Sequence, residues 1–100
     1  MRVAWVMHLK PGQEAAYKKK HDEIWPELVE LIKRDGIRNY SIYRHGLTLF
    51  AYYECDEPPP RGKARDEVRR RWHEWMAPHM ETLEDDRPVS EALEEMFHLD

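Results

Sequence analysis

The sequence predicts an α+β domain of the ferredoxin-like class, with the element order β-α-β-β-α-β. Two stretches have helical periodicity, and four short apolar stretches alternate as strands do. A helical stretch follows the first strand and another precedes the last, while the two central strands are joined by a short turn. This order is typical of a four-stranded antiparallel sheet with both helices on one face. We expect one domain over residues 1–100, because a chain of this length is too short for two independent cores.

The first third of the chain predicts one strand and one interrupted helix. Residues 3–9 alternate between two sides and read as a strand, which ends at Pro11-Gly12. Residues 13–34 have helical periodicity, but Pro26 lacks the N–H that would bond the carbonyl four residues earlier. We therefore expect the helix to kink or break at Pro26, and Gly36 to cap its end.

The middle of the chain predicts a hairpin. Residues 37–44 and 47–54 are rich in Tyr, Ile, Leu and Phe, as strands are. His45-Gly46 separates them, and glycine supplies the positive φ that a tight hairpin turn requires. We expect the second of these strands to reach Cys55.

The last part of the chain predicts a connector, a helix and a final strand. The proline-rich residues 58–62 are expected to form a stiff connector. From residue 64 onward apolar positions recur as in an amphipathic helix, which Pro78 ends or bends. Residues 93–99 are expected to form the last strand.

Composition indicates a homodimer that binds neither nucleic acid nor membranes. Four Trp, five Tyr and five Met must supply the bulk of a small core. Because both helices are expected on one face of the sheet, the other face must be covered by something else, and we expect a second copy there. The net charge is −4, whereas nucleic-acid-binding domains usually carry a positive balance. No apolar stretch approaches the roughly 20 residues of a membrane span. Cys55 is the single cysteine and the N-terminus has no signal-peptide pattern, which favours the cytoplasm.

A histidine among aromatic residues is the candidate for chemistry. On a helix, Tyr17, His21 and Leu28 share one face, which places an imidazole beside a phenol. An unperturbed imidazole has a pKa of about 6.5 and can exchange protons near neutral pH. The structural alternative is a partly buried histidine bonded to a nearby carbonyl, and spacing alone favours that alternative. Tyr17 is likewise compatible with core packing.

Three further residues are ambiguous by pattern. Tyr40 shares a strand face with Ile42, which leaves packing and ligand binding equally open. Trp72 lies on the apolar stripe of its helix, so a core position is the plain interpretation. His73 lies off that stripe and is expected to face solvent.

Other kinds of chemistry have no support in the sequence. The six histidines lack the His-x-x-x-His type of spacing and the cysteine stands apart, so we expect no metal. There is no Gly-rich phosphate loop and no Gly-x-Ser-x-Gly motif. We therefore expect neither dinucleotide use nor serine-hydrolase activity.

Along its whole length the sequence resembles the L-rhamnose mutarotase family. The segments that carry the resemblance are residues 21–28 (HDEIWPEL), 39–43 (NYSIY), 49–54 (LFAYYE), Arg71-Trp72 with Met76, and residues 88–99, which begin PVS and end LEEMFHL. The order and spacing of these pieces, rather than any one of them, make the resemblance specific. The connector at residues 58–62 is unlike the family's usual run.

The resemblance implies a dimeric α/β-barrel that interconverts sugar anomers without a cofactor, with one sugar site per subunit. By matching position, His21 takes the proton-donor role, and Tyr17, Tyr40 and Trp72 contact the sugar. The family often has a second tryptophan where this chain has His73, so His73 falls at a substrate-contact position with its role open. A water molecule and a tyrosine hydroxyl are both open as the base that takes the anomeric proton, which the sequence does not identify.

Two other functions are compatible with the same fold, because fold alone does not determine function. One is a cofactor-free oxygenase or isomerase built on a dimeric barrel, which would favour a planar aromatic substrate. The other is a non-catalytic, small-ligand-binding dimer in which His21 is structural.

Overall fold

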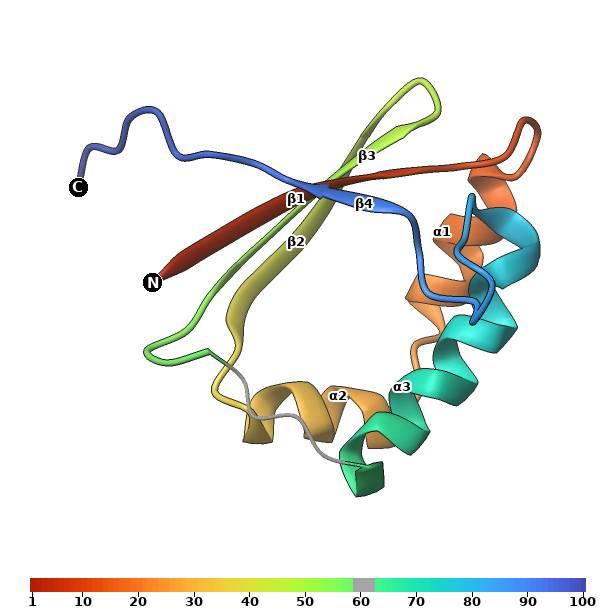
Figure 1. Cartoon of the computed structure of the whole chain (residues 1–100), viewed down its shortest axis with the longest axis horizontal. Helices are drawn as coiled ribbons and strands as arrows, with labels where there is room; N and C mark the ends of the chain where they lie inside the picture. The colour runs from red at the N-terminus through yellow and green to blue at the C-terminus, as the bar shows by residue number, and fades with distance from the viewer. Residues whose placement is uncertain (59–62) are drawn as a thin grey trace.

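A computed structural model describes residues 1–58 and 63–100 of the chain (Figure 1). Most of the connector predicted at residues 58–62 thus lies outside the described residues. The elements in chain order are β1 (Arg2–His8), α1 (Glu14–Asp22), α2 (Pro26–Arg34), β2 (Arg38–His45), β3 (Thr48–Glu54), α3 (Lys63–Met76), the 3-10 helix η1 (Ala77–His79) and β4 (Ser90–Ala92).

The strands form one four-stranded sheet in the order β2-β3-β1-β4, in which every neighbouring pair is antiparallel. The helices lie to one side of this sheet, and both termini lie at the end away from them (Figure 1). The predicted antiparallel α+β arrangement is confirmed. Gly46 has φ +60° in the turn between β2 and β3, as the hairpin prediction required.

The helix predicted over residues 13–34 is two helices. The first, α1, ends at Asp22, and Pro26 starts α2, where its missing N–H would have no intrahelical partner in any case. Trp25 is extended at ψ 132°, as the residue before a proline prefers. The break expected at Pro26 is therefore confirmed. Gly36 follows α2 with φ +80°, and its N–H donates to the Lys33 carbonyl at 3.0 Å, which confirms the predicted cap.

The last strand was predicted at the wrong place. Instead of residues 93–99, β4 comprises Ser90–Ala92, which pair with Met7–Trp5 of β1. Leu93 still donates its N–H to the Ala4 carbonyl, but the chain beyond it has no strand assignment. The apolar residues of this segment favoured a strand, yet they could not show whether a neighbouring strand would be there to pair with it.

The core lies between the helices and the sheet face that they cover. Met7 of β1 and Leu9, the residue after β1, belong to it, together with Leu49 and Ala51 of β3. Its remaining buried members come from the helices and the segment after them: Tyr17, Leu28, Trp72, Met76 and Met80. The helix α3 ends before Pro78, as predicted. None of the helices in the described part of the chain is long and apolar enough to cross a membrane.

Candidate active site

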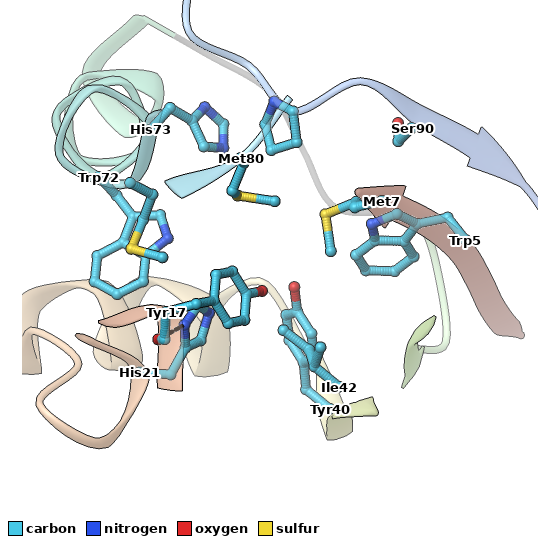
Figure 2. A pocket seen from close by; sticks show the side chains of 12 residues that line it. Trp5, Met7, Tyr17, His21, Tyr40, Ile42, Trp72, His73, Met80 and Ser90 are labelled. Atoms are coloured by element: carbon cyan, nitrogen blue, oxygen red, sulfur yellow. Dashed lines mark hydrogen bonds between the residues drawn. The ribbon is translucent and has the colours of Figure 1, made fainter. Parts of the chain in front are cut away.

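A cavity of about 170 Å³ opens between α1, α3 and the helix-facing side of the sheet (Figure 2). All five residues singled out from the sequence line it, although only two of them are neighbours in the chain. At about 30 Å³ per water molecule it equals the space of roughly six waters, which suits one small ligand. The lining residues are Trp5, Met7, Tyr17, His21, Tyr40, Ile42, Trp72, His73, Met76, Met80, Pro88 and Ser90.

His21 stands one helical turn after Tyr17 on α1, and their rings lie 4.3 Å apart between centroids. The ring Nδ1 is 3.2 Å from the Tyr17 carbonyl oxygen. Because a carbonyl can only accept, Nδ1 carries the proton and donates it, which leaves Nε2 for other partners. Burial lowers the pKa of His21, against smaller raising effects of this hydrogen bond and of Asp22. His21 thus has the hydrogen bond to a carbonyl that a structural histidine would make, and it also lines the cavity.

Two phenols meet in the cavity. Figure 2 shows the hydroxyls of Tyr17 and Tyr40 pointing toward one another across its lower part. Burial raises the pKa of Tyr17 well above its usual range, and it raises the pKa of Tyr40 to about 12. Tyr40 has 40% of its whole surface exposed, so the raised pKa reflects the buried position of its hydroxyl end. Both tyrosines remain protonated near neutral pH and can donate as well as accept hydrogen bonds.

Trp72 forms both core and cavity wall. Its ring meets the His21 ring edge-on, with centroids 5.3 Å apart and an interplanar angle of 87°. It meets Trp25 in the same way at 5.3 Å and 89°. Edge-to-face contacts of this kind hold aromatic rings in a defined orientation. The core position expected for Trp72 and its placement beside His21 are therefore not alternatives.

His73 does not face open solvent, as its place off the apolar stripe had predicted. It is half-buried and lines the cavity. The loop before β4 lies against it, so a helical pattern within α3 alone could not reveal the cover. Burial lowers the pKa of His73, and Arg69 and Arg87 add to this effect, while Asp85 and Asp86 oppose it.

Seven lining residues were not among the sequence candidates. The strand residues Trp5 and Met7 could have been found, since alternation in β1 puts them on the same side. No pattern in the neighbouring sequence indicates that Pro88 and Ser90 line the cavity, because the path of the loop into β4 brings them there. The three other residues are Ile42, Met76 and Met80.

The cavity wall is neutral and is shared with a wider groove. No carboxylate, ammonium or guanidinium group is among the lining side chains of the described chain. Tyr17, His21 and Tyr40 also border a groove of about 1040 Å³ that involves α1, α2 and the edge strand β2. Among the described residues, no group of three or more His, Cys, Asp or Glu side chains could hold a metal ion.

Fold and site together define a small α+β protein with a neutral, aromatic cavity that two imidazoles and two phenols line. Such a site is suited to proton transfer on an uncharged small molecule, since imidazole is the side chain that titrates near neutral pH.

Comparison with known proteins identifies the family. The family model for L-rhamnose mutarotase matches residues 2–99. The L-rhamnose mutarotase of Listeria monocytogenes is 43% identical over 101 residues, covering 98% of this chain and 97% of that protein. The protein of the same name from Bacteroides thetaiotaomicron is 42% identical over 102 residues, covering 99% and 98%. The crystal structure of L-rhamnose mutarotase from Formosa agariphila superposes with a TM-score of 0.89 at 39% identity, covering 100% and 99%. The chain belongs to the L-rhamnose mutarotase family.

Proposed function

We propose that this protein is an aldose mutarotase of rhamnose metabolism. It interconverts the α and β anomers of L-rhamnose, or of a closely related deoxy sugar, without a cofactor. The observation that carries the proposal is the cavity of about 170 Å³ in which Tyr17, His21, Tyr40, Trp72 and His73 meet. Family membership over residues 2–99 favours this activity over the oxygenase and the non-catalytic alternatives.

Mutarotation needs two proton transfers and no redox step. The ring oxygen gains a proton while the anomeric hydroxyl loses one, the ring opens to the aldehyde, and the aldehyde rotates and recloses on its other face. His21, as imidazolium, gives the proton to the ring oxygen from Nε2, because Nδ1 is bonded to the Tyr17 carbonyl. A well-placed acid of this kind contributes roughly 10²- to 10⁴-fold in rate. Burial makes this imidazolium a stronger acid, but less of it is present at neutral pH.

The neutral cavity suits the neutral sugar. The hydroxyls of Tyr17 and Tyr40 can hydrogen-bond to sugar hydroxyls, and Trp72 offers a flat apolar surface to the 6-methyl edge of the ring. His73 contacts the sugar from α3. A charged side chain is not required for recognition, because the ligand has no charge to balance.

The test is anomer exchange measured by saturation-transfer NMR. Replacing His21→Gln should reduce the exchange rate about 10²- to 10⁴-fold while sugar binding is retained. His45→Gln is the matched control, since His45 lies exposed at the end of β2, outside the cavity. Undiminished exchange in the His21 variant would exclude the proton-donor role. Turnover of phenols instead of deoxy sugars would support the oxygenase, and wild-type exchange equal to that in buffer would support the non-catalytic dimer.

We also propose that the protein is a homodimer whose sheets pack face to face as a dimeric α/β-barrel. Tyr43 and Phe50 are directly paired across β2 and β3, and both are exposed on the sheet face away from the helices. Met96, Phe97 and Leu99 of the C-terminal segment are 84%, 81% and 79% exposed. Apolar surface of this extent is typical of an interface. Sedimentation equilibrium should give the dimer mass, and Phe50→Glu should give the monomer. A monomeric wild type would refute the proposal.

A cytoplasmic location is part of the same proposal. The support is Cys55, a free and buried thiol, because free cysteines are typical of proteins in reducing compartments. Fractionation of cells with an antibody to the protein should find it in the cytoplasmic fraction, and recovery from the envelope or the medium would contradict this location.

A further inference from the structure

We infer that His73 is the group that takes the proton from the anomeric hydroxyl, so that the cavity holds an acid–base pair of imidazoles, His21 and His73. This inference rests on the proposed function and deepens it, since the proposed reaction leaves its base unassigned.

The composition of the cavity wall narrows the choice of base. Of its lining side chains only four titrate, namely Tyr17, His21, Tyr40 and His73. Burial raises the pKa of both tyrosines, so their phenolates are scarce near neutral pH and cannot accept the proton. The two imidazoles remain as groups that exchange a proton in the neutral range. If His21 serves as the acid, His73 is the base that is left.

The placement of the two imidazoles fits one acid and one base on different walls of the cavity. They belong to different helices, α1 and α3, and in Figure 2 they approach the cavity with Trp72 lying between them in the view. The ring oxygen and the anomeric oxygen are bonded to the same sugar carbon, so an acid and a base on two walls can reach them together. His21 has one nitrogen bonded to a carbonyl, whereas within residues 1–58 and 63–100 no hydrogen bond involves either ring nitrogen of His73. Both nitrogens of His73 are therefore available to the sugar.

The charges around His73 keep it in the form that a base requires. Arg69 lies one turn earlier on α3, and Arg87 lies in the loop before β4; both lower the pKa of His73, as burial does. Asp85 and Asp86 of the same loop raise it, but the net direction is downward. His73 is consequently neutral near pH 7 and has a free lone pair. Among the described residues, the charge that acts on the pKa of His21 is that of Asp22, which raises it.

The reaction then balances within one turnover. His73 takes the proton of the anomeric hydroxyl as the bond between the anomeric carbon and the ring oxygen breaks, and His21 gives its proton to the ring oxygen. After the aldehyde rotates, the former ring hydroxyl attacks the other face of the carbonyl carbon and returns its proton to His21. His73 returns its proton to the carbonyl oxygen. Both imidazoles recover their starting states, and nothing else is consumed.

The test is the pH profile of anomer exchange in the wild type, in His73→Gln and in His45→Gln. The wild-type profile should be bell-shaped, falling on the acidic side as His73 gains a proton and on the alkaline side as His21 loses one. His73→Gln should lower the exchange rate about 10²-fold and remove the acidic fall while the alkaline fall remains. His45→Gln should follow the wild type. In the wild type, the His73 ring signal should titrate with the midpoint of one of the two falls, a check that does not depend on the variant folding.

Three results would overturn the inference. The first is an acidic fall that persists in His73→Gln, and the second is an undiminished exchange rate in that variant. The third is a His73 titration that coincides with neither fall. Wild-type exchange no faster than in buffer is a different outcome, because it would refute the proposed function itself.

Discussion

Removing Arg69 is expected to destabilise the protein more than removing its neighbour Arg70, because Arg69 pairs with a fully buried carboxylate and Arg70 with exposed ones. Arg69 on α3 donates from Nη2 to Oδ2 of Asp35 at 3.0 Å, and Asp35 follows the last residue of α2. The Asp35 side chain is 0% exposed, whereas that of Arg69 is 27% exposed. Removal of Arg69 therefore takes a hydrogen-bond donor from a fully buried carboxylate.

The burial of each partner sets the expected magnitudes. Arg69→Met removes the Nη2 donor that lies 3.0 Å from a fully buried carboxylate, and the loss of a hydrogen bond to a charged group costs about 1.5–3 kcal/mol. Asp35→Asn leaves a guanidinium that already reaches water, and it keeps a hydrogen-bond acceptor at the same place. We expect a loss of about 1–2 kcal/mol for that variant. Arg70 is the matched control, since it pairs with Glu67 and Glu74 on the surface, where loss costs about 0–1 kcal/mol.

The assay is urea unfolding of wild type, Arg69→Met, Asp35→Asn and Arg70→Met, followed by tryptophan fluorescence. All four proteins must be compared at one protein concentration, because the stability of an associating protein depends on it. A loss for Arg69→Met that is no larger than the loss for Arg70→Met would refute this account of the pair. Arg69 also lowers the pKa of His73, so the histidine should titrate at higher pH in Arg69→Met.

Three smaller predictions address the cavity, a turn and the response to pH. Tyr40→Phe should weaken sugar binding about 2- to 10-fold in calorimetry, because one hydroxyl hydrogen bond contributes about 0.5–1.5 kcal/mol; unchanged affinity would contradict the contact. Gly36→Ala should cost about 1–2 kcal/mol in urea unfolding, since φ is +80° and no atom within 4 Å would meet the new methyl group; a neutral effect would contradict the strain. Folding lowers the pKa of His21 and His73, so below about pH 6.5 the unfolded chain binds more protons than the folded chain does. The free energy of unfolding should therefore fall from pH 7 toward pH 5. Replacing both histidines with Gln should flatten that fall.

Much of the fold could be predicted because the decisive rules act locally. Pro26 lacks one N–H whatever surrounds it, and the chain breaks into α1 and α2 at that residue. Gly46 can adopt a positive φ whatever surrounds it, and the hairpin follows. The alternation in β1 likewise placed Met7 on the covered face of the sheet.

The errors have a common physical origin in contacts that the local pattern does not encode. His73 is covered by a loop that arrives from beyond η1, and a helical pattern in α3 contains no information about that loop. Residues 93–99 contain four apolar side chains, which favoured a strand, but in the described part of the chain no strand pairs with them beyond Leu93. The roles of the site residues had a different source, namely the resemblance to a family, because spacing alone favoured a structural role for His21.

Burial acts on all four titratable groups of the cavity in the same sense. It lowers the pKa of His21 and His73 and raises the pKa of Tyr17 and Tyr40, so that each group is neutral near pH 7. A cavity without charge matches a sugar without charge, and it avoids trapping ions. The same burial makes the imidazolium of His21 scarce, while proton transfer is most efficient when the acid's pKa lies near the working pH. A more polar wall would restore the population of the acid but weaken it as a donor, so the depth of burial at α1 sets how the catalytic rate depends on pH.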